Sequence, residues 1–128
     1  MNHALAGAFA ALSAAGIPVW WWLLFRSARV REWFVPEEAW PAIQSVMPAD
    51  AVLAMLTGYL ALELCRRRRP PVLAGIVFGA WAYATAYTIA WAAAVRAPLA
   101  GPASMAVALA GIGYILYDMV SPRVTRDR

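Results

Sequence analysis

The fold of this chain is decided by residues 72–95, which read VLAGIVFGAWAYATAYTIAWAAAV. This stretch contains no charged residue. As an α-helix that rises ~1.5 Å per residue it would be ~36 Å long. The hydrocarbon core of a bilayer is ~30 Å thick, so such a helix is long enough to cross it at a tilt. We therefore expect a transmembrane helix over residues 72–95.

Three further long apolar stretches lie at residues 4–25, 48–64 and 103–120. The first has no charged residue, and the other two have acids only near their ends. The first is not a signal peptide by pattern, because residues 1–3 contain no Arg or Lys and the apolar run is longer than a signal peptide needs. Pro18 is expected to kink the first helix. The sequence thus predicts an all-α membrane protein with four transmembrane helices in a compact bundle, as a single domain over residues 1–128.

The overall composition agrees with a membrane chain. Hydrophobic residues make up 63% and charged residues 14% of the sequence, whereas a soluble domain has roughly a quarter of its residues charged. All 11 basic residues are Arg, and the net charge is +4. Basic residues beside apolar spans are expected from membrane topology, so we do not predict a nucleic-acid partner. The absence of Lys, together with abundant Ala, indicates a GC-rich bacterial gene.

The scarcity of metal-ligating and redox-active residues excludes several functions. Cys65 is the only cysteine and His3 the only histidine. One cysteine forms neither an intramolecular disulfide nor a CxxC centre. One histidine does not supply the paired ligands of a membrane di-haem cytochrome, and the two residues together do not make a Cys/His zinc site. We therefore expect no metal and no cofactor.

The distribution of arginines predicts the orientation. Seven arginines share a side with the N-terminus: Arg66 to Arg69, Arg123, Arg126 and Arg128. Four lie on the other side: Arg26, Arg29, Arg31 and Arg96. Cytoplasmic segments are enriched in basic residues, so the majority favours both termini in the cytoplasm of a multi-pass cell-membrane protein. The three arginines that follow the first span argue the other way.

The long connection between the first two spans contains a second helical pattern. Pro36, Glu37 and Glu38 are typical of a first helical turn with acidic residues at its positive end. Apolar residues then recur at helical spacing: Trp40, Ile43 and Met47. This pattern predicts an amphipathic helix over about residues 36–47 that lies in the headgroup region. The two glutamates either begin that helix or face a cationic or polar ligand that enters from outside.

Helix association inside lipid depends on close van der Waals contact, which small residues allow. Three spans carry small residues at intervals of three or four: Gly7, Ala11 and Ala15; Gly75, Gly79, Ala82, Ala86, Ala90 and Ala94; Ala106, Ala110 and Gly113. These stripes predict a tight bundle. The sequence leaves open whether they pack within the chain or against a second copy in a homo-oligomer.

Three acidic residues lie near the ends of the spans and are the candidates for proton or ion binding: Asp50, Glu63 and Asp118. Each also has a structural interpretation. Asp50 suits the positive end of the second span's helix. Glu63 precedes Arg66 and Arg67 by three and four residues, the spacing of a helical ion pair. Asp118 has Arg123 just beyond it. These structural interpretations are preferred.

The third span carries an aromatic stripe. Tyr83, Tyr87 and Trp91 follow one another at intervals of four residues and share one helix face. Such a stripe suits a cleft for a flat apolar or cationic ligand. Ordinary bundle packing with an interfacial Trp gives the same stripe and is the preferred interpretation. With Trp40, Glu37 and Glu38, these residues form the predicted ligand-binding set.

Several function classes remain after these exclusions. The sequence contains no nucleophile triad, phosphate-binding loop or paired carboxylates. We expect a non-enzymatic membrane protein that binds a lipophilic small molecule or another membrane protein. The alternatives are a small proton-coupled secondary transporter and a lipid-modifying enzyme, which has the least support.

Overall fold

The computed structural model describes residues 2–121. Its elements in chain order are α1 (His3–Arg26), α2 (Ala28–Phe34), the 3₁₀ helix η1 (Glu37–Ala39), α3 (Trp40–Gln44), α4 (Met47–Cys65), α5 (Pro71–Val95) and α6 (Ala100–Val120). No strand occurs among these described residues. Residues 122–128, which hold three of the arginines in the orientation count, lie outside them.

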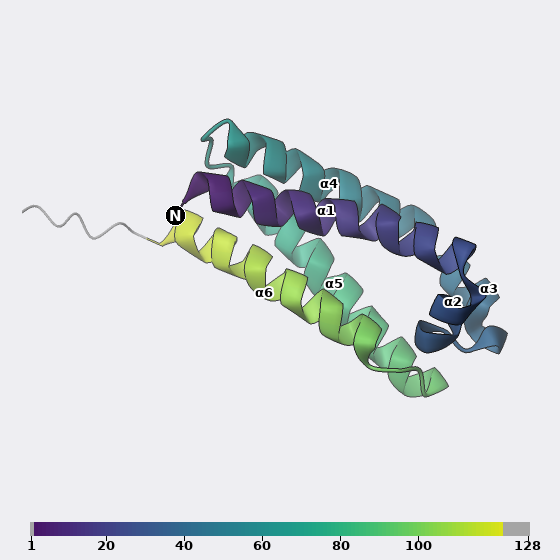
Figure 1. Ribbon diagram of the computed structural model, residues 1–128. Helices are drawn as coiled ribbons and strands as arrows, with labels where there is room; N and C mark the ends of the chain where they lie inside the picture. The colour runs from purple at the N-terminus through teal and green to yellow at the C-terminus, as the bar shows by residue number, and fades with distance from the viewer. Residues whose placement is uncertain (1, 122–128) are drawn as a thin grey trace, which may run out of the picture.

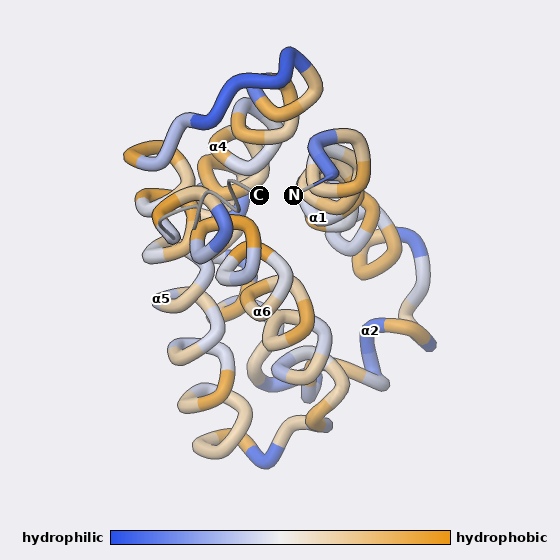
Figure 2. The backbone as a smooth tube through the Cα atoms, turned by 90° about the vertical axis from the view of Figure 1, so that its left-hand side faces the viewer, coloured by the Kyte–Doolittle hydropathy of each residue, from blue (hydrophilic) through white to orange (hydrophobic). Residues whose placement is uncertain are grey.

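Four helices, α1, α4, α5 and α6, are long and apolar enough to cross a membrane. This confirms the number of long apolar helices that the sequence predicts and their positions to within a few residues. Figure 2 shows the hydrophilic segments at the ends of the long helices, most clearly at the turn after α4. Polar caps start two of the helices: the Asn2 side chain accepts from the backbone N–H of Ala4 at 3.1 Å, and Ser27 caps α2.

The long helices are arranged as two antiparallel pairs (Figure 1). α1 packs along α4, and α5 packs along α6; contacts between the two pairs are fewer. The pairs lie close together at the end that holds the N-terminus and the α4–α5 turn, and they separate toward the end that holds α2 and α3. The packed half and the open half of the molecule are therefore at opposite ends.

The hydrophobic core fills the packed half. All four long helices contribute buried residues there: Ala6 and Ala10 from α1, Leu60 and Leu64 from α4, Ala74 and Val77 from α5, Ile112 and Ile115 from α6. Glycines permit close approach in this half. A Cβ on Gly7 would lie 2.8 Å from Cys65 Sγ, and a Cβ on Gly111 would collide with the Phe9 ring. The glycines thus bring α1 against both α4 and α6.

The small-residue stripes do not all pack inside the bundle. On α1 the buried small residues are Ala6, Gly7 and Ala10, while Ala11 is exposed. A Cβ on Gly75 or on Gly79 would meet no atom within 4 Å. The stripe on α5 therefore faces outward from this chain, because its opposite face, with Ala74, Val77 and Trp81, is the one that packs on the core.

The connection between α1 and α4 differs from the single helix expected over 36–47. It forms α2, which was not expected, and then η1 and the five-residue helix α3. The Ser27 side chain starts α2 by accepting the Val30 N–H at 3.3 Å. Pro41 stands in the first turn of α3, where its missing N–H costs no hydrogen bond, so this proline starts a new short helix and does not extend a longer one.

Candidate functional site

A cavity of about 810 Å³ occupies the open half of the bundle. Residues of α1, α4, α5 and α6 line it, and the segment from Phe34 to Val46 contributes to its wall. Its aromatic residues are Phe9, Trp20, Trp21, Phe34, Trp81, Tyr83, Tyr87 and Trp91. The cavity lies where Figure 1 shows the two helix pairs separating. Its volume and its aromatic lining suit a small molecule.

Trp81 separates the cavity from the core. It is only 4% exposed and belongs both to the core cluster and to the cavity wall. Its indole N–H donates to Thr57 Oγ1 at 3.0 Å. The Thr57 hydroxyl in turn donates to the Leu53 carbonyl oxygen at 2.7 Å. This chain of hydrogen bonds fixes α5 against α4 at the inner boundary of the cavity.

Asp50 is the only residue with a carboxylate or basic side chain among the described residues that line the cavity. It lies in the first turn of α4. Its Oδ2 accepts a hydrogen bond from Trp21 Nε1–H at 2.9 Å. Trp21 is 5% exposed and comes from α1. The hydrogen bond therefore positions the carboxylate on a wall that is otherwise uncharged and mostly apolar or aromatic.

The predicted aromatic stripe of α5 lies on the opposite wall. Tyr83, Tyr87 and Trp91 all line the cavity. Tyr83 is 75% exposed, so the stripe extends from the cavity to its rim. Thr88, one position beyond Tyr87, also lines the cavity, and its Oγ1 lies 2.8 Å from the Ala84 carbonyl oxygen. The structure thus brings the stripe and Asp50 to one cavity.

The other three members of the predicted binding set lie outside this cavity. Trp40 packs behind Trp21, with ring centroids 6.4 Å apart. The Arg31 guanidinium lies over the outer side of the Trp40 ring, 4.9 Å from its centroid. Glu37 and Glu38 are exposed and do not line the cavity. Trp40 therefore supports the cavity wall from outside.

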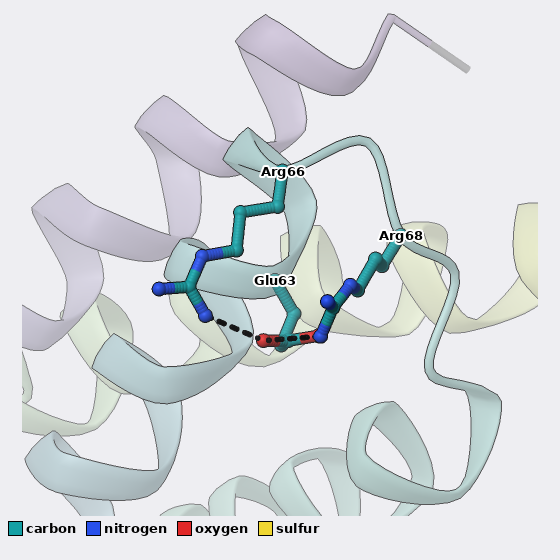
Figure 3. A network of polar contacts seen from close by, with 3 residues as sticks. All are labelled: Glu63, Arg66 and Arg68. Atoms are coloured by element: carbon teal, nitrogen blue, oxygen red, sulfur yellow. Dashed lines mark hydrogen bonds and ion pairs between the residues drawn. The ribbon is translucent and has the colours of Figure 1, made fainter.

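Glu63 lies at the packed end of the molecule and does not line the cavity. Its buried side chain pairs with Arg66 at 3.2 Å and with Arg68 at 3.1 Å (Figure 3). Arg67, the second expected partner, has φ 59°. Its N–H bonds to the Leu64 carbonyl, and the Arg68 N–H bonds to the Glu63 carbonyl. This left-handed helix end turns the chain and presents Arg68 in place of Arg67.

Asp118 is also tied to the arginine turn. Its carboxylate pairs with Arg69 at 3.2 Å, and Arg69 Nη2 contacts the Asp118 carbonyl oxygen as well. The expected partner Arg123 lies outside the described residues. The ion pair joins the end of α6 to the α4–α5 turn. The three acidic candidates therefore form no single site, since only Asp50 faces the cavity.

Metal binding has no support in the part of the chain that the structure describes. No three His, Cys, Asp or Glu side chains within residues 2–121 are grouped so that they could hold a metal ion. His3 and Cys65 do line a second hollow of about 620 Å³, between the first turns of α1 and the end of α4. Two such side chains make an incomplete coordination set.

Comparison with known proteins gives no further guide, since no family model, curated protein or solved structure matches this chain. The function has to be inferred from the site itself. Sequence reasoning missed the hydrogen bond between Trp21 and Asp50. The triplet Trp20–Trp22 suggested only an interfacial belt, and no local signal connects it to a residue about thirty positions later.

Proposed function

We propose that this chain is a four-span membrane protein that binds a lipophilic small molecule in the cavity between its two helix pairs. The observation that carries the proposal is the cavity of about 810 Å³ with aromatic walls and one fixed carboxylate. Cavities for small ligands usually measure 300–1,000 Å³ and combine apolar walls with a few placed polar groups. The proposed role is non-enzymatic, and both termini are placed in the cytoplasm.

The proposed orientation puts the cavity in the outer half of the membrane. The arginine turn at residues 66–69 marks the cytoplasmic side in this arrangement. The segment of α2, η1 and α3 then lies in the outer headgroup region. Its exposed Trp33 suits that depth, and its Phe34 and Ile43 close part of the cavity wall. We propose that the ligand enters from the outer leaflet beside this segment.

Cys65 offers a direct test of orientation, because it is the only cysteine of the chain, is exposed, and precedes the arginine turn. We expect a membrane-impermeant maleimide to leave Cys65 unmodified in intact cells and to modify it after permeabilisation. A membrane-permeant maleimide modifies it in both. The chain should also stay in the membrane pellet after an alkaline carbonate wash. Modification of Cys65 in intact cells by the impermeant reagent would show that the orientation is the reverse of the proposed one.

Gly16 provides a test of the cavity. It lines the cavity, and a Cβ added to it would meet no atom within 4 Å. The change Gly16→Phe should therefore fill the cavity without disturbing the helices. With the neutral photoreactive probe 3-trifluoromethyl-3-phenyldiazirine, we expect labelling of the cavity-wall residues Leu56 and Ala84 to fall about tenfold. That fall corresponds to ~1.4 kcal/mol of lost affinity. Peptide mass spectrometry measures it.

Gly79→Phe is the matched control for this experiment. Gly79 also has open space around its Cβ position, but it is exposed and does not line the cavity. The control should keep wild-type labelling at Leu56 and Ala84. If the probe labels Leu56 and Ala84 as strongly in Gly16→Phe as in Gly79→Phe, it reaches them from lipid and not through the cavity. The proposal would then be wrong.

The alternative functions would each use a different part of the structure. A proton-coupled transporter would use Asp50, the acid that lines the cavity, and would need a path through the core around Leu60 and Ile112, both fully buried. A partner protein would use the outward stripe of α5. A lipid-modifying enzyme would need a second acid or base beside Asp50. Binding without transport requires none of these additions, and we prefer it.

A further inference from the structure

The carboxylate of Asp50 has no basic partner in the described part of the chain. Its Oδ2 receives the Trp21 N–H, and its Oδ1 makes no hydrogen bond within residues 2–121. No Arg is among the described residues that line the cavity. Arg31 lies over the Trp40 ring, 4.9 Å from its centroid, and the structure gives it no ion pair with Asp50. One negative group with one free oxygen thus faces an apolar space.

The two described acids at the packed end differ from Asp50, because each has a basic partner. Glu63 pairs with Arg66 and Arg68, and Asp118 pairs with Arg69. These two acids near the ends of described helices are thus each matched by arginine. Asp50 at the start of α4 has only the helix dipole and one neutral donor. Burial in the wall opposes the ionised carboxylate, whereas the dipole and the Trp21 N–H favour it. Within the described residues its second oxygen has no partner, so a cation in the cavity would supply the stabilisation that is missing.

The walls around this charge are rich in aromatic rings. Trp20 and Trp21 come from α1, and Tyr87 and Trp91 come from α5. Ring faces attract cations through their quadrupole, by ~0.5–2 kcal/mol each according to the degree of desolvation. A carboxylate and several rings around an apolar space form the usual chemistry for binding an ammonium group. An anion would meet repulsion from Asp50 and find no basic residue on the cavity wall.

We propose that the ligand of this cavity is a lipophilic cation, with an apolar body among the aromatic walls and its positive group at Asp50. This inference rests on the proposed function and specifies its ligand class. The ligand belongs to the chemistry of protonated or quaternary amines on a hydrophobic frame. Asp50 makes the charge contact, and Trp21 is a positioning residue that holds the carboxylate toward the cavity.

Two ions of matched shape test the charge preference. Tetraphenylphosphonium and tetraphenylborate have the same arrangement of four rings and opposite charges. Binding is measured in a neutral detergent by titration calorimetry, with the cavity-filled Gly16→Phe protein as the background for partition into the micelle. We expect the wild-type protein to bind the phosphonium at least tenfold more tightly than the borate. Equal affinity for the two ions would overturn the inference.

Asp50→Asn removes the charge and keeps an oxygen that accepts the Trp21 N–H. We expect it to lose phosphonium affinity about tenfold, while neutral diazirine labelling of Leu56 and Ala84 stays at the wild-type level. Asp50→Glu keeps the charge and should keep most of the preference. Glu38→Gln is the matched control, because it removes an exposed acid near the same end that does not line the cavity.

The outcomes separate the two proposals. If the diazirine labels the cavity but Asp50→Asn binds the phosphonium as the wild type does, the cation preference is wrong and the cavity proposal remains. If neither the diazirine nor the phosphonium distinguishes the wild-type protein from Gly16→Phe, both proposals are wrong. If Asp50→Asn does not fold, the wild-type comparison of phosphonium with borate still decides the charge preference.

Discussion

Trp81→Ala is expected to destabilise the folded bundle by about 3–5 kcal/mol, the usual cost of removing a large buried aromatic side chain. Trp81 is 4% exposed, packs in the core cluster and donates to Thr57 across the α4–α5 interface. The substitution would join an empty volume in the core to the ligand cavity. In the proposed membrane setting lipid is as apolar as the core, so the loss would come from packing and hydrogen bonding and not from exposure to water.

Two further variants separate the contribution of the hydrogen bond from that of burial. Trp81→Phe keeps most of the ring and loses the hydrogen bond to Thr57, so we expect a smaller cost of ~0.6–1.7 kcal/mol for the bond. Trp33→Ala removes the same side chain where it is 68% exposed, on α2, and should cost little. Reversible unfolding in mixed micelles measures all three. A loss in Trp81→Ala no larger than that in Trp33→Ala would contradict the assigned role.

The helical spans could be predicted because hydropathy and length alone determine them. Residues 72–95 contain no charged residue and are followed by Arg96. In the structure, α5 spans Pro71–Val95. The buried face of each helix could not be predicted in the same way. Both faces of α5 are apolar, so the sequence has no contrast that shows which face packs. The outward Gly75 and Gly79 could therefore be mistaken for packing residues.

The candidate site was predictable in part. Tyr83, Tyr87 and Trp91 lie on one helix, so their spacing is enough to place them on one face. Asp50 was noted as an acid near a span, but its contact with Trp21 joins α1 to α4. Contacts between helices depend on their rotation and separation, which spacing along one helix does not give. The cavity arises from the separation of two helix pairs, and a single sequence contains no signal for it.

The charged turn shows how a local conformation changes a pairing prediction. Helical spacing from Glu63 pointed to Arg66 and Arg67. The first pair forms at 3.2 Å, but the helix ends at Cys65 and Arg67 takes a left-handed conformation. A turn after residue 64 was predicted from the Arg run and Pro70–Pro71, but glycine is the usual residue in a left-handed helix end, so nothing in the sequence placed that conformation at Arg67. Arg68 then returns toward Glu63 (Figure 3).

Gly7→Leu is the second substitution with a large expected effect. A Cβ at this position lies 2.8 Å from Cys65 Sγ and 3.5 Å from the Ala61 carbonyl oxygen. Cys65 Sγ can rotate away, but the backbone of α4 cannot yield without moving the helix. The added atoms of leucine should force α1 from α4, at a cost of about 1–3 kcal/mol or more. The same unfolding measurement in mixed micelles records the loss.

Ala8→Leu is the matched control, since Ala8 is the next residue and is exposed. It adds similar bulk at an exposed position that borders the second hollow, where there is room for it, and should leave stability near the wild-type value. A loss in Gly7→Leu equal to that of Ala8→Leu would show that α1 does not pack on α4 through Gly7. The consequence reaches the binding site, because α1 carries Trp21, which positions Asp50 on α4. If α1 and α4 move apart, the phosphonium preference of the cavity should weaken together with the stability, although Gly7 lies in the other half of the bundle.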